Sequence, residues 1–275
     1  MLAFKRVSRP KENRTIMAVF AHPDDEAFLV GGTLAHYARQ GINIDLVCLT
    51  RGEKGSTEKL PGAEKNLARL RQSELEKCCK VLGARLLPTQ IFPDGKLAEI
   101  GSERLVRPIE KLIKTRQPDI VLTFGPDGLT GHPDHIAIHH ATTRAFQKAA
   151  QPGKALFYAS LAAYHVDRLS NRLDGSLGDL PLRLTGIETS QISAAIDIRH
   201  TSHLKWAALN CHRTQSSNFA GLNQADVLLL SHLEHFRLAR IAGLHPGLTF
   251  APRQVQAGLF EVLDLAKKGY LEIAS

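Results

Sequence analysis

Short apolar runs alternate with longer stretches of helical periodicity along the first part of the chain. This alternation is typical of a parallel sheet covered by helices on both faces, because a chain that joins two parallel strands crosses over through a helix. Strands are predicted at residues 15–20, 42–50, within 85–92 and at 119–124. Helices are predicted after them, at residues 27–40, 63–82, 103–116 and 133–148.

The order of these segments predicts where the fourth strand pairs. If right-handed crossovers carry the chain outward through the second and third strands, the fourth strand returns to the other side of the first. The predicted fold class is therefore α/β, with a Rossmann-like, open and mostly parallel sheet and helices on both faces. We expect a single domain over residues 15–275, less regular from about residue 152.

The C-terminal part carries weaker signals. Strands are predicted at residues 155–160 and 194–198, and a helix at 202–213. Residues 169–186 mix Gly, Pro, Asp and Arg without periodicity. We interpret them as a long loop that could be a lid or simply an insertion.

Composition favours a protein that folds without covalent or metal crosslinks. The chain has 275 residues, 43% of them hydrophobic and 23% charged, which is enough to bury a sizeable core. No run approaches the roughly 18 apolar residues that a membrane helix needs. The cysteines form no C-x-x-C pair and are interpreted as reduced, mostly buried thiols. They are Cys48, Cys78, Cys79 and Cys211. We expect a soluble, cytoplasmic protein without a membrane span.

The formal net charge is +8, and much of it lies at the N-terminus. Residues 1–14 contain five basic residues and one acidic residue, Glu12. They are predicted to form a basic, mobile arm. Because aromatic residues make up only 6% of the chain and no recognition helix is evident, we expect no nucleic-acid partner.

The tripeptide His-Pro-Asp occurs twice, at residues 22–24 and 132–134, each time directly after a predicted strand. Proline disfavours helical geometry in the residue before it, so His22 and His132 should be extended and project from the strand ends. Both prolines suit the first position of a helix, and the acidic residues behind them should lie in its first turn. Because the two strands pair, the copies should meet at the crevice where open α/β sheets bind ligands.

Imidazoles and carboxylates without thiolates are a ligand set for catalytic zinc, which keeps a fourth position for water. Iron(II) could occupy the same ligands. If His22, Asp25 and His135 bind the metal, Asp24 stays uncoordinated beside it and can take a proton from water. His132 then faces the substrate.

We expect the Asp134 carboxylate to hold the His132 ring in one tautomer and to favour its protonated form. A protonated His132 could stabilise an oxyanion or protonate the leaving amine.

The motifs A-H-P-D-D-E at residues 21–26, G-P-D-G at 125–128 and G-H-P-D-H at 131–135 resemble the N-acetylglucosaminyl-phosphatidylinositol de-N-acetylase family, also called PIG-L or LmbE-like. The resemblance covers about residues 15 to 215. It continues through residues 50–53, 71–74 and 92–95, and weakly through 205–215.

This resemblance implies a fold, a metal and a set of roles. It implies that His22, Asp25 and His135 bind zinc, that Asp24 is the general base and that His132 supports the oxyanion. Arg71 and Asp94 match positions that hold the sugar or its attached group in relatives. Bacterial members deacetylate N-acetylglucosamine conjugates, including intermediates of mycothiol and bacillithiol synthesis.

Two departures from the family's pattern narrow the substrate. Members of the mycothiol pathway carry a tyrosine two residues before the H-P-D-H histidine, where this chain has Thr130. The N-terminal membrane helix of the eukaryotic members has no counterpart here, which argues against a glycolipid embedded in the bilayer. The expected partner is a small-molecule amino-sugar conjugate, and a homo-oligomer is compatible with the sequence.

The predicted function is zinc-dependent removal of an N-acyl group, in the first instance acetyl, from an N-acetylglucosamine-type conjugate. A metal-dependent phosphoesterase and a non-catalytic sugar-binding module are the alternatives. Simpler roles are open for three residues: Arg71 could belong to a solvated helix face, Asp94 to a Pro-Asp-Gly turn, and His212 to the packed interior.

Overall fold

A computed structural model describes residues 14–57, 62, 64–172, 184–215, 232–244 and 258–267. Its N-terminal half contains β1 (Thr15–Phe20), α1 (Asp25–Ala38), β2 (Asn43–Cys48), α2 (Leu67–Leu82), β3 (Arg85–Leu86), α3 (Ser102–Arg116), β4 (Ile120–Phe124) and α4 (Pro133–Ala149). The remainder contains β5 (Ala155–Ala162), α5 (Ala163–Arg172), β6 (Gly186–Ile187), β7 (Ala194–Asp197), α6 (Ser202–Leu209), β8 (Leu233–Ile241) and α8 (Leu259–Lys267). Short 3-10 helices lie at Glu64–Asn66, Leu97–Glu99 and Thr189–Gln191.

The strands form one sheet in the order β3-β2-β1-β4-β5-β8-β7, with β6 paired to β5. The pairs from β3 to β5 are parallel, and β8 runs antiparallel to both β5 and β7. The predicted open, mostly parallel sheet is therefore confirmed. β1 lies between β2 and β4, and all six of its residues are buried, as expected of a strand covered on both faces.

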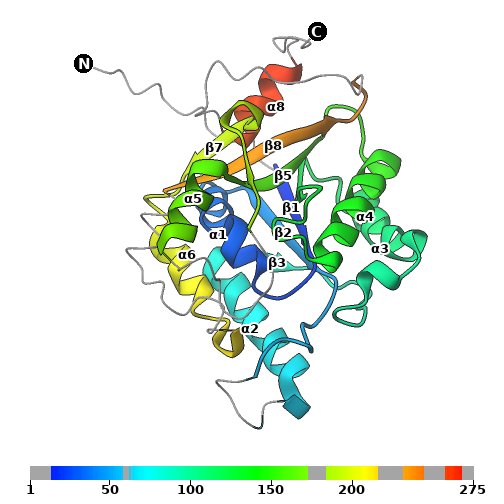
Figure 1. Ribbon diagram of the computed structural model, residues 1–275. Coiled ribbons are helices and arrows are strands. Elements are labelled where there is room, and N and C mark those ends of the chain that lie inside the picture. The colour runs from blue at the N-terminus through cyan, green and yellow to red at the C-terminus, as the bar shows by residue number, and fades with distance from the viewer. Residues whose placement is uncertain are drawn as a thin grey trace.

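Helices cover both faces of the sheet, as predicted (Figure 1). One face carries α1, α2 and α6, which pack against one another, and the other carries α3 and α4. β1 and β4 both end at the same edge, because they are parallel neighbours in the sheet. The loops that follow them therefore begin side by side, which is the arrangement the two His-Pro-Asp copies require.

Several boundaries differ from the prediction. The third strand is confined to Arg85–Leu86, and the helix expected at 202–213 ends at Leu209. The strand β8 was not predicted, since Glu234, His235 and Arg237 interrupt its apolar pattern. The helix α5 extends to Arg172, into the segment interpreted as a loop, and residues 173–183 lie outside the described part.

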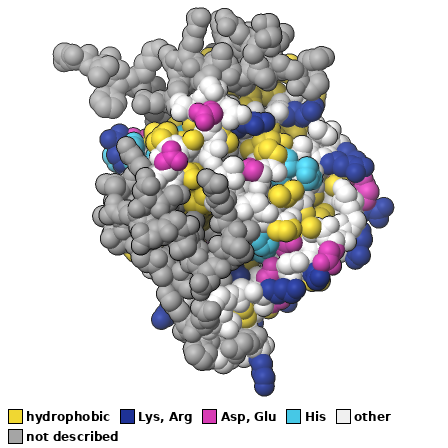
Figure 2. Space-filling view, viewed as in Figure 1, with side chains coloured by type: hydrophobic (Ala, Val, Ile, Leu, Met, Phe, Trp, Pro, Cys, Tyr) yellow, Lys and Arg dark blue, Asp and Glu magenta, His cyan; other side chains and the backbone are white. Residues whose placement is uncertain are grey.

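Residues 1–13 of the predicted arm lie outside the described residues. Arg14 is described, and its guanidinium donates to the Asp264 carboxylate at 2.9 and 3.1 Å. Figure 2 shows basic side chains gathered over α3 and α4, interspersed with acidic ones. Lys148, for example, binds Glu103 on this surface.

All four cysteines are free thiols, and three of them are buried. In the ranges that the structure describes, no helix is both long enough and apolar enough to span a bilayer.

Candidate metal centre

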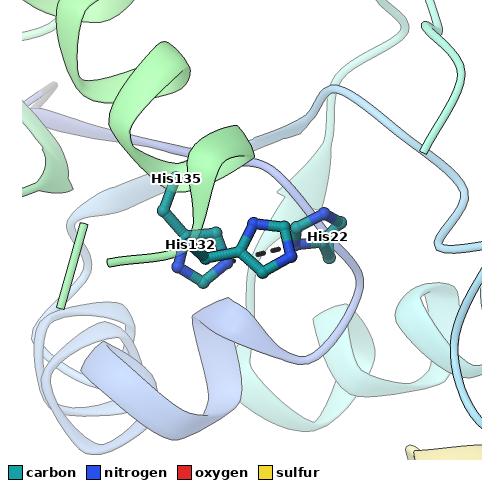
Figure 3. Close-up of side chains that lie close together, drawn as sticks. All are labelled: His22, His132 and His135. Carbon is teal, nitrogen blue, oxygen red and sulfur yellow. Dashed lines mark hydrogen bonds between the residues drawn. The ribbon is translucent and has the colours of Figure 1, made fainter. Parts of the chain in front are cut away.

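The rings of His22 and His135 meet at the edge of the sheet where β1 and β4 end. The first lies two residues after β1 and the second in the first turn of α4. Although 113 positions separate them in the sequence, His22 Nδ1 lies 3.1 Å from His135 Nε2 (Figure 3). The His132 ring joins them, with its centroid 4.7 Å from that of His135. The predicted meeting of the two copies is confirmed.

The two copies of His-Pro-Asp enter their helices differently. His132 is extended and caps α4, and Pro133 is the first helical residue, as expected. The expectation for Pro23 is wrong, because α1 begins only at Asp25. Between them, Asp24 adopts a left-handed backbone with φ 119°. The Pro23 carbonyl accepts a hydrogen bond from Arg71 instead of one from the helix.

Hydrogen bonds at the far side of each ring fix which nitrogen faces the centre. His135 Nδ1 donates to the carbonyl of Gly128 at 3.0 Å, which leaves Nε2 as an acceptor. His22 Nε2 lies 3.0 Å from Asp94 Oδ1 and 3.3 Å from Asp134 Oδ2, so in the neutral ring that binds a metal Nε2 donates and Nδ1 is left as an acceptor. Two acceptor nitrogens that face each other are stabilised by a cation shared between them.

Asp25 completes a triangle with these nitrogens. Its Oδ1 lies 3.3 Å from His135 Nε2, and its Oδ2 lies 3.6 Å from His22 Nδ1. Tetrahedral zinc, with bonds of roughly 2.0–2.1 Å, separates neighbouring ligand atoms by roughly 3.3 Å. The separations of 3.1 Å between the two nitrogens and 3.3 Å between His135 Nε2 and Asp25 Oδ1 match that spacing, while Asp25 Oδ2 accepts the backbone N–H of His22 at 2.8 Å. These three side chains therefore fit a zinc ion, with Oδ1 as the oxygen ligand.

The charge around the centre also favours a cation. Burial raises the pKa of Asp25, but the imidazoles of His135 and His22 outweigh it and hold that pKa well below its usual range. Burial lowers the pKa of His22, but hydrogen bonds to Asp134, Asp25 and Asp94 outweigh it, and the pKa lies well above its usual value. Three carboxylates thus surround two imidazoles, and this excess of negative charge attracts a positive ion.

Asp24 precedes Asp25 in the sequence, and its left-handed backbone turns its carboxylate towards Arg71. Its Oδ2 accepts a hydrogen bond from Arg71 at 3.1 Å. Burial raises the pKa of Asp24 to about 6, against the opposing charge of Arg71. A carboxyl with a pKa close to neutrality is suited to accept and return a proton at physiological pH.

The expected link between the Asp134 carboxylate and the His132 ring is wrong. That carboxylate accepts the backbone N–H groups of Gly95 and Leu97 at 2.8 and 2.9 Å and faces His22. His132 Nδ1 instead accepts the backbone N–H of Asp134 at 3.1 Å. The neutral His132 ring therefore carries its proton on Nε2, where it can be donated.

The protonated form of His132 is not favoured either. Burial, together with the neighbouring imidazoles of His22 and His135, lowers the pKa of His132 to about 4. The ring is therefore neutral at physiological pH and acts as a hydrogen-bond donor through Nε2.

Arg71 and Asp94, which the resemblance assigns to substrate binding, contact other protein groups of the centre. The guanidinium of Arg71 is buried and donates to the carbonyls of Pro23 and Gly52 as well as to Asp24. The Asp94 carboxylate binds His22 Nε2 and accepts the backbone N–H of Lys54 at 2.8 Å. Both groups position the centre, and their contact with substrate stays a prediction.

Two residues at the site, Phe124 and Glu26, were not predicted to act there, and a third, His212, was left open. The Phe124 ring stacks on His135, with centroids 4.1 Å apart and planes 10° apart. Glu26 lies beneath Asp24 and binds His212, whose reach to the crevice was left open by the sequence. Phe124 ends a predicted strand, and that pattern does not reveal its stacking on His135. Glu26 ends the A-H-P-D-D-E motif, and the motif does not reveal a partner 186 positions away.

Comparison with known proteins identifies relatives of this chain. Residues 17–146 match the family model described as PIG-L: GlcNAc-PI de-N-acetylase. The chain is 31% identical over 258 residues to a 1D-myo-inositol 2-acetamido-2-deoxy-alpha-D-glucopyranoside deacetylase of Mycobacteroides abscessus, a match that covers 82% of this chain and 92% of the relative.

Two solved structures have a similar fold at low sequence identity. The N,N'-diacetylchitobiose deacetylase of Pyrococcus horikoshii has a TM-score of 0.58 and 21% identity, covering 94% of this chain and 92% of that one. The 4-carboxy-2-hydroxymuconate hydratase GalB of Pseudomonas putida KT2440 has a TM-score of 0.59 and 18% identity, covering 84% and 98%. On the strength of the motifs, the fold and the relative that matches along most of its length, the chain belongs to the PIG-L family of GlcNAc-PI de-N-acetylases.

Proposed function

We propose that the chain is a zinc-dependent hydrolase that removes the N-acetyl group from an N-acetylglucosamine-type conjugate. The observation that carries this proposal is the triangle of His22, Asp25 and His135, in which His135 Nε2 lies 3.1 Å from His22 Nδ1 and 3.3 Å from Asp25 Oδ1, with Asp24 next in sequence to Asp25. Iron(II) prefers similar ligands and is the second candidate metal.

When bound, zinc supplies a Lewis acid for the amide carbonyl and lowers the pKa of water at the site. Asp24 then accepts a proton from the attacking water and returns it to the amine as the amide C–N bond breaks. Arg71 holds the Asp24 carboxylate in place at 3.1 Å. His132 donates its Nε2 proton in a hydrogen bond to the oxygen on which negative charge develops. The products are acetate and the free amino sugar.

The substrate class rests on what the relatives share. Both the inositol-linked deacetylase and the chitobiose deacetylase are named for removal of acetyl from an acetamido sugar. We therefore propose that the substrate of this chain contains an acetamido sugar, and we leave the rest of the molecule open. With Thr130 in place of tyrosine, any hydroxyl contact to the oxyanion from this position would come from a shorter side chain.

A phosphoesterase would call for two metals roughly 4 Å apart. A second acidic group does exist, in which His22, Asp94 and Asp134 lie close together. The carboxylates in it are already engaged by backbone N–H groups of Lys54, Gly95 and Leu97, as well as by His22 Nε2. These contacts favour a single metal at this centre.

The proposal is tested by acetate release from N-acetylglucosamine conjugates and short chitin oligomers, with and without a chelator. We expect turnover that is lost on chelation and restored by zinc. In the variant Asp24→Asn we expect kcat to fall by orders of magnitude while zinc stays bound. Near-normal turnover in that variant would refute the role of Asp24, and tight sugar binding without acetate release would support the non-catalytic alternative.

A further inference from the structure

We infer that His212 is a positioning residue that acts through Glu26 on the backbone of Asp24. This inference rests on the proposed function. It assigns a role in the reaction to a residue that only the weak sequence match at residues 205–215 connects with the site.

Asp24 needs such support because its backbone is strained. A non-glycine residue with φ 119° occupies a sparsely populated region and persists only when its surroundings hold it there. The carboxylate direction of Asp24 depends on this backbone turn, since the side chain leaves from the strained Cα. The backbone N–H of Asp24 donates to Glu26 Oε2 at 3.1 Å, which holds the turn from beneath.

The Glu26 carboxylate is itself oriented by His212. Glu26 Oε1 lies 2.7 Å from His212 Nε2, and the two residues are 1% and 0% exposed. A buried carboxylate of this kind keeps one orientation only while its hydrogen bonds are satisfied. Among the described residues, His212 Nδ1 has no hydrogen-bond partner, so Nε2 is the nitrogen through which the ring acts.

His212 is anchored to α1, which carries Asp25 and Glu26, and to α2, which carries Arg71. It follows α6, a helix that packs against α1 and α2. Two residues on, Thr214 donates its backbone N–H and its hydroxyl to Glu74 at 2.9 and 2.6 Å, one turn along α2 from Arg71. Arg71 thus holds the carboxylate of Asp24, whereas His212, through Glu26, holds its backbone N–H.

Glu26, Cys78 and His212 could instead be taken for a second metal site, because their ligand atoms lie close together. The 2.7 Å separation of Glu26 Oε1 and His212 Nε2 argues against this interpretation. It is a hydrogen-bond length and is shorter than the roughly 3.3 Å between neighbouring ligands of a tetrahedral ion.

The test compares two replacements of His212 with a matched control. His212→Phe keeps the ring shape and removes the donor, whereas His212→Gln keeps an Nε2 donor at a similar reach. The control Thr201→Val removes a buried hydrogen bond from Thr201 to the Gly32 carbonyl of α1, at 2.9 Å and away from the centre. The readouts are kcat, KM, zinc content and unfolding midpoint on the full chain.

We expect His212→Phe to lower kcat by about tenfold to a hundredfold, with KM and zinc content near wild type, and His212→Gln to recover most of kcat. Thr201→Val should lower the unfolding midpoint without lowering kcat. In an Asp24→Asn background, His212→Phe should have no further effect on kcat, because its target is already lost.

A kcat for His212→Phe equal to that of Thr201→Val, or a full additional loss in the Asp24→Asn background, would overturn the inference. An inactive wild-type protein would instead overturn the proposed function, so the two failures are distinguishable.

Discussion

At the residue scale, the binding capacity of a histidine is decided by the hydrogen bond at its other ring nitrogen. His135 donates to the Gly128 carbonyl, and His22 donates to the carboxylates of Asp94 and Asp134. Each ring is left with one lone pair that faces the centre. We therefore expect Asp134 to support the proposed metal through His22, although its place in the second His-Pro-Asp copy suggested a partnership with His132.

This arrangement predicts that Asp134→Asn weakens zinc binding. The amide can still accept a backbone N–H, but it removes the negative charge that faces His22 Nε2 at 3.3 Å. Loss of such an outer partner costs about 10–100-fold in metal affinity. Competition with a chromogenic chelator measures it, and an affinity equal to wild type would show that Asp134 does not support His22.

At the element scale, the loops after β1 and β2 are packed onto Arg71. The ideal Cβ position at Gly52 lies 2.4 Å from the Arg71 guanidinium, and Gly52 has φ 64°. Only glycine fits there without displacing the side chain that holds Pro23 and Asp24. By contrast, Gly41, with φ 82° after α1, has open space around its Cβ position.

The variants Gly52→Ala and Gly41→Ala separate the effect of backbone strain, which both share, from the displacement of Arg71, which only Gly52→Ala causes. Each puts a side chain on a left-handed backbone, which costs about 1 kcal/mol of stability. Gly52→Ala should in addition lower kcat at least tenfold, because it displaces Arg71, while Gly41→Ala should leave kcat unchanged. Parallel kinetics and urea unfolding measure both effects, and equal kcat values in the two variants would count against the packing argument.

Elements with a strong period were predictable from the sequence, and those shaped by distant partners were not. The strand at 15–20 was predicted at its observed bounds, because a β-branched threonine and the five consecutive apolar residues after it are all buried. β8 was missed because Glu234 and His235 are polar residues inside the protein. Likewise the proposed metal ligands follow from two motifs, whereas the His212–Glu26 contact depends on tertiary packing.

At the scale of the whole molecule, the C-terminal strand is tied to the first helix by a buried ion pair. Glu234 of β8 accepts the backbone N–H groups of Gly32 and Thr33 at 3.0 and 2.7 Å and binds Lys205 Nζ at 2.6 Å. Both charged residues are almost fully buried, at 3% and 4% exposed. This tie joins β8, α1 and α6 across about 200 residues of sequence.

Glu234→Gln should therefore destabilise the protein by about 3–5 kcal/mol, because it leaves the Lys205 charge buried and uncompensated. The double variant Glu234→Gln, Lys205→Met should recover part of that loss. Chemical denaturation measures both changes, and a loss below about 1 kcal/mol for the single variant would show that water reaches Lys205.

Acid should also destabilise the fold through His235. Burial lowers its pKa to about 4 in the folded state, below the ordinary value of 6.5. The unfolded chain therefore binds a proton first, and stability present above pH 6.5 is lost as the pH falls towards 4. His235→Gln should make the unfolding free energy less dependent on pH across this window, and an unchanged slope would contradict the assignment.

The central claim is that His22, Asp25 and His135 hold one cation while Asp24 stays beside it. It is tested most directly by the zinc content of the purified protein and its variants. We predict one zinc per chain in the wild type and in Asp24→Asn, and less than a tenth of that in His22→Ala, Asp25→Ala and His135→Ala. Full zinc content in His135→Ala, or two zinc ions per chain in the wild type, would contradict the account.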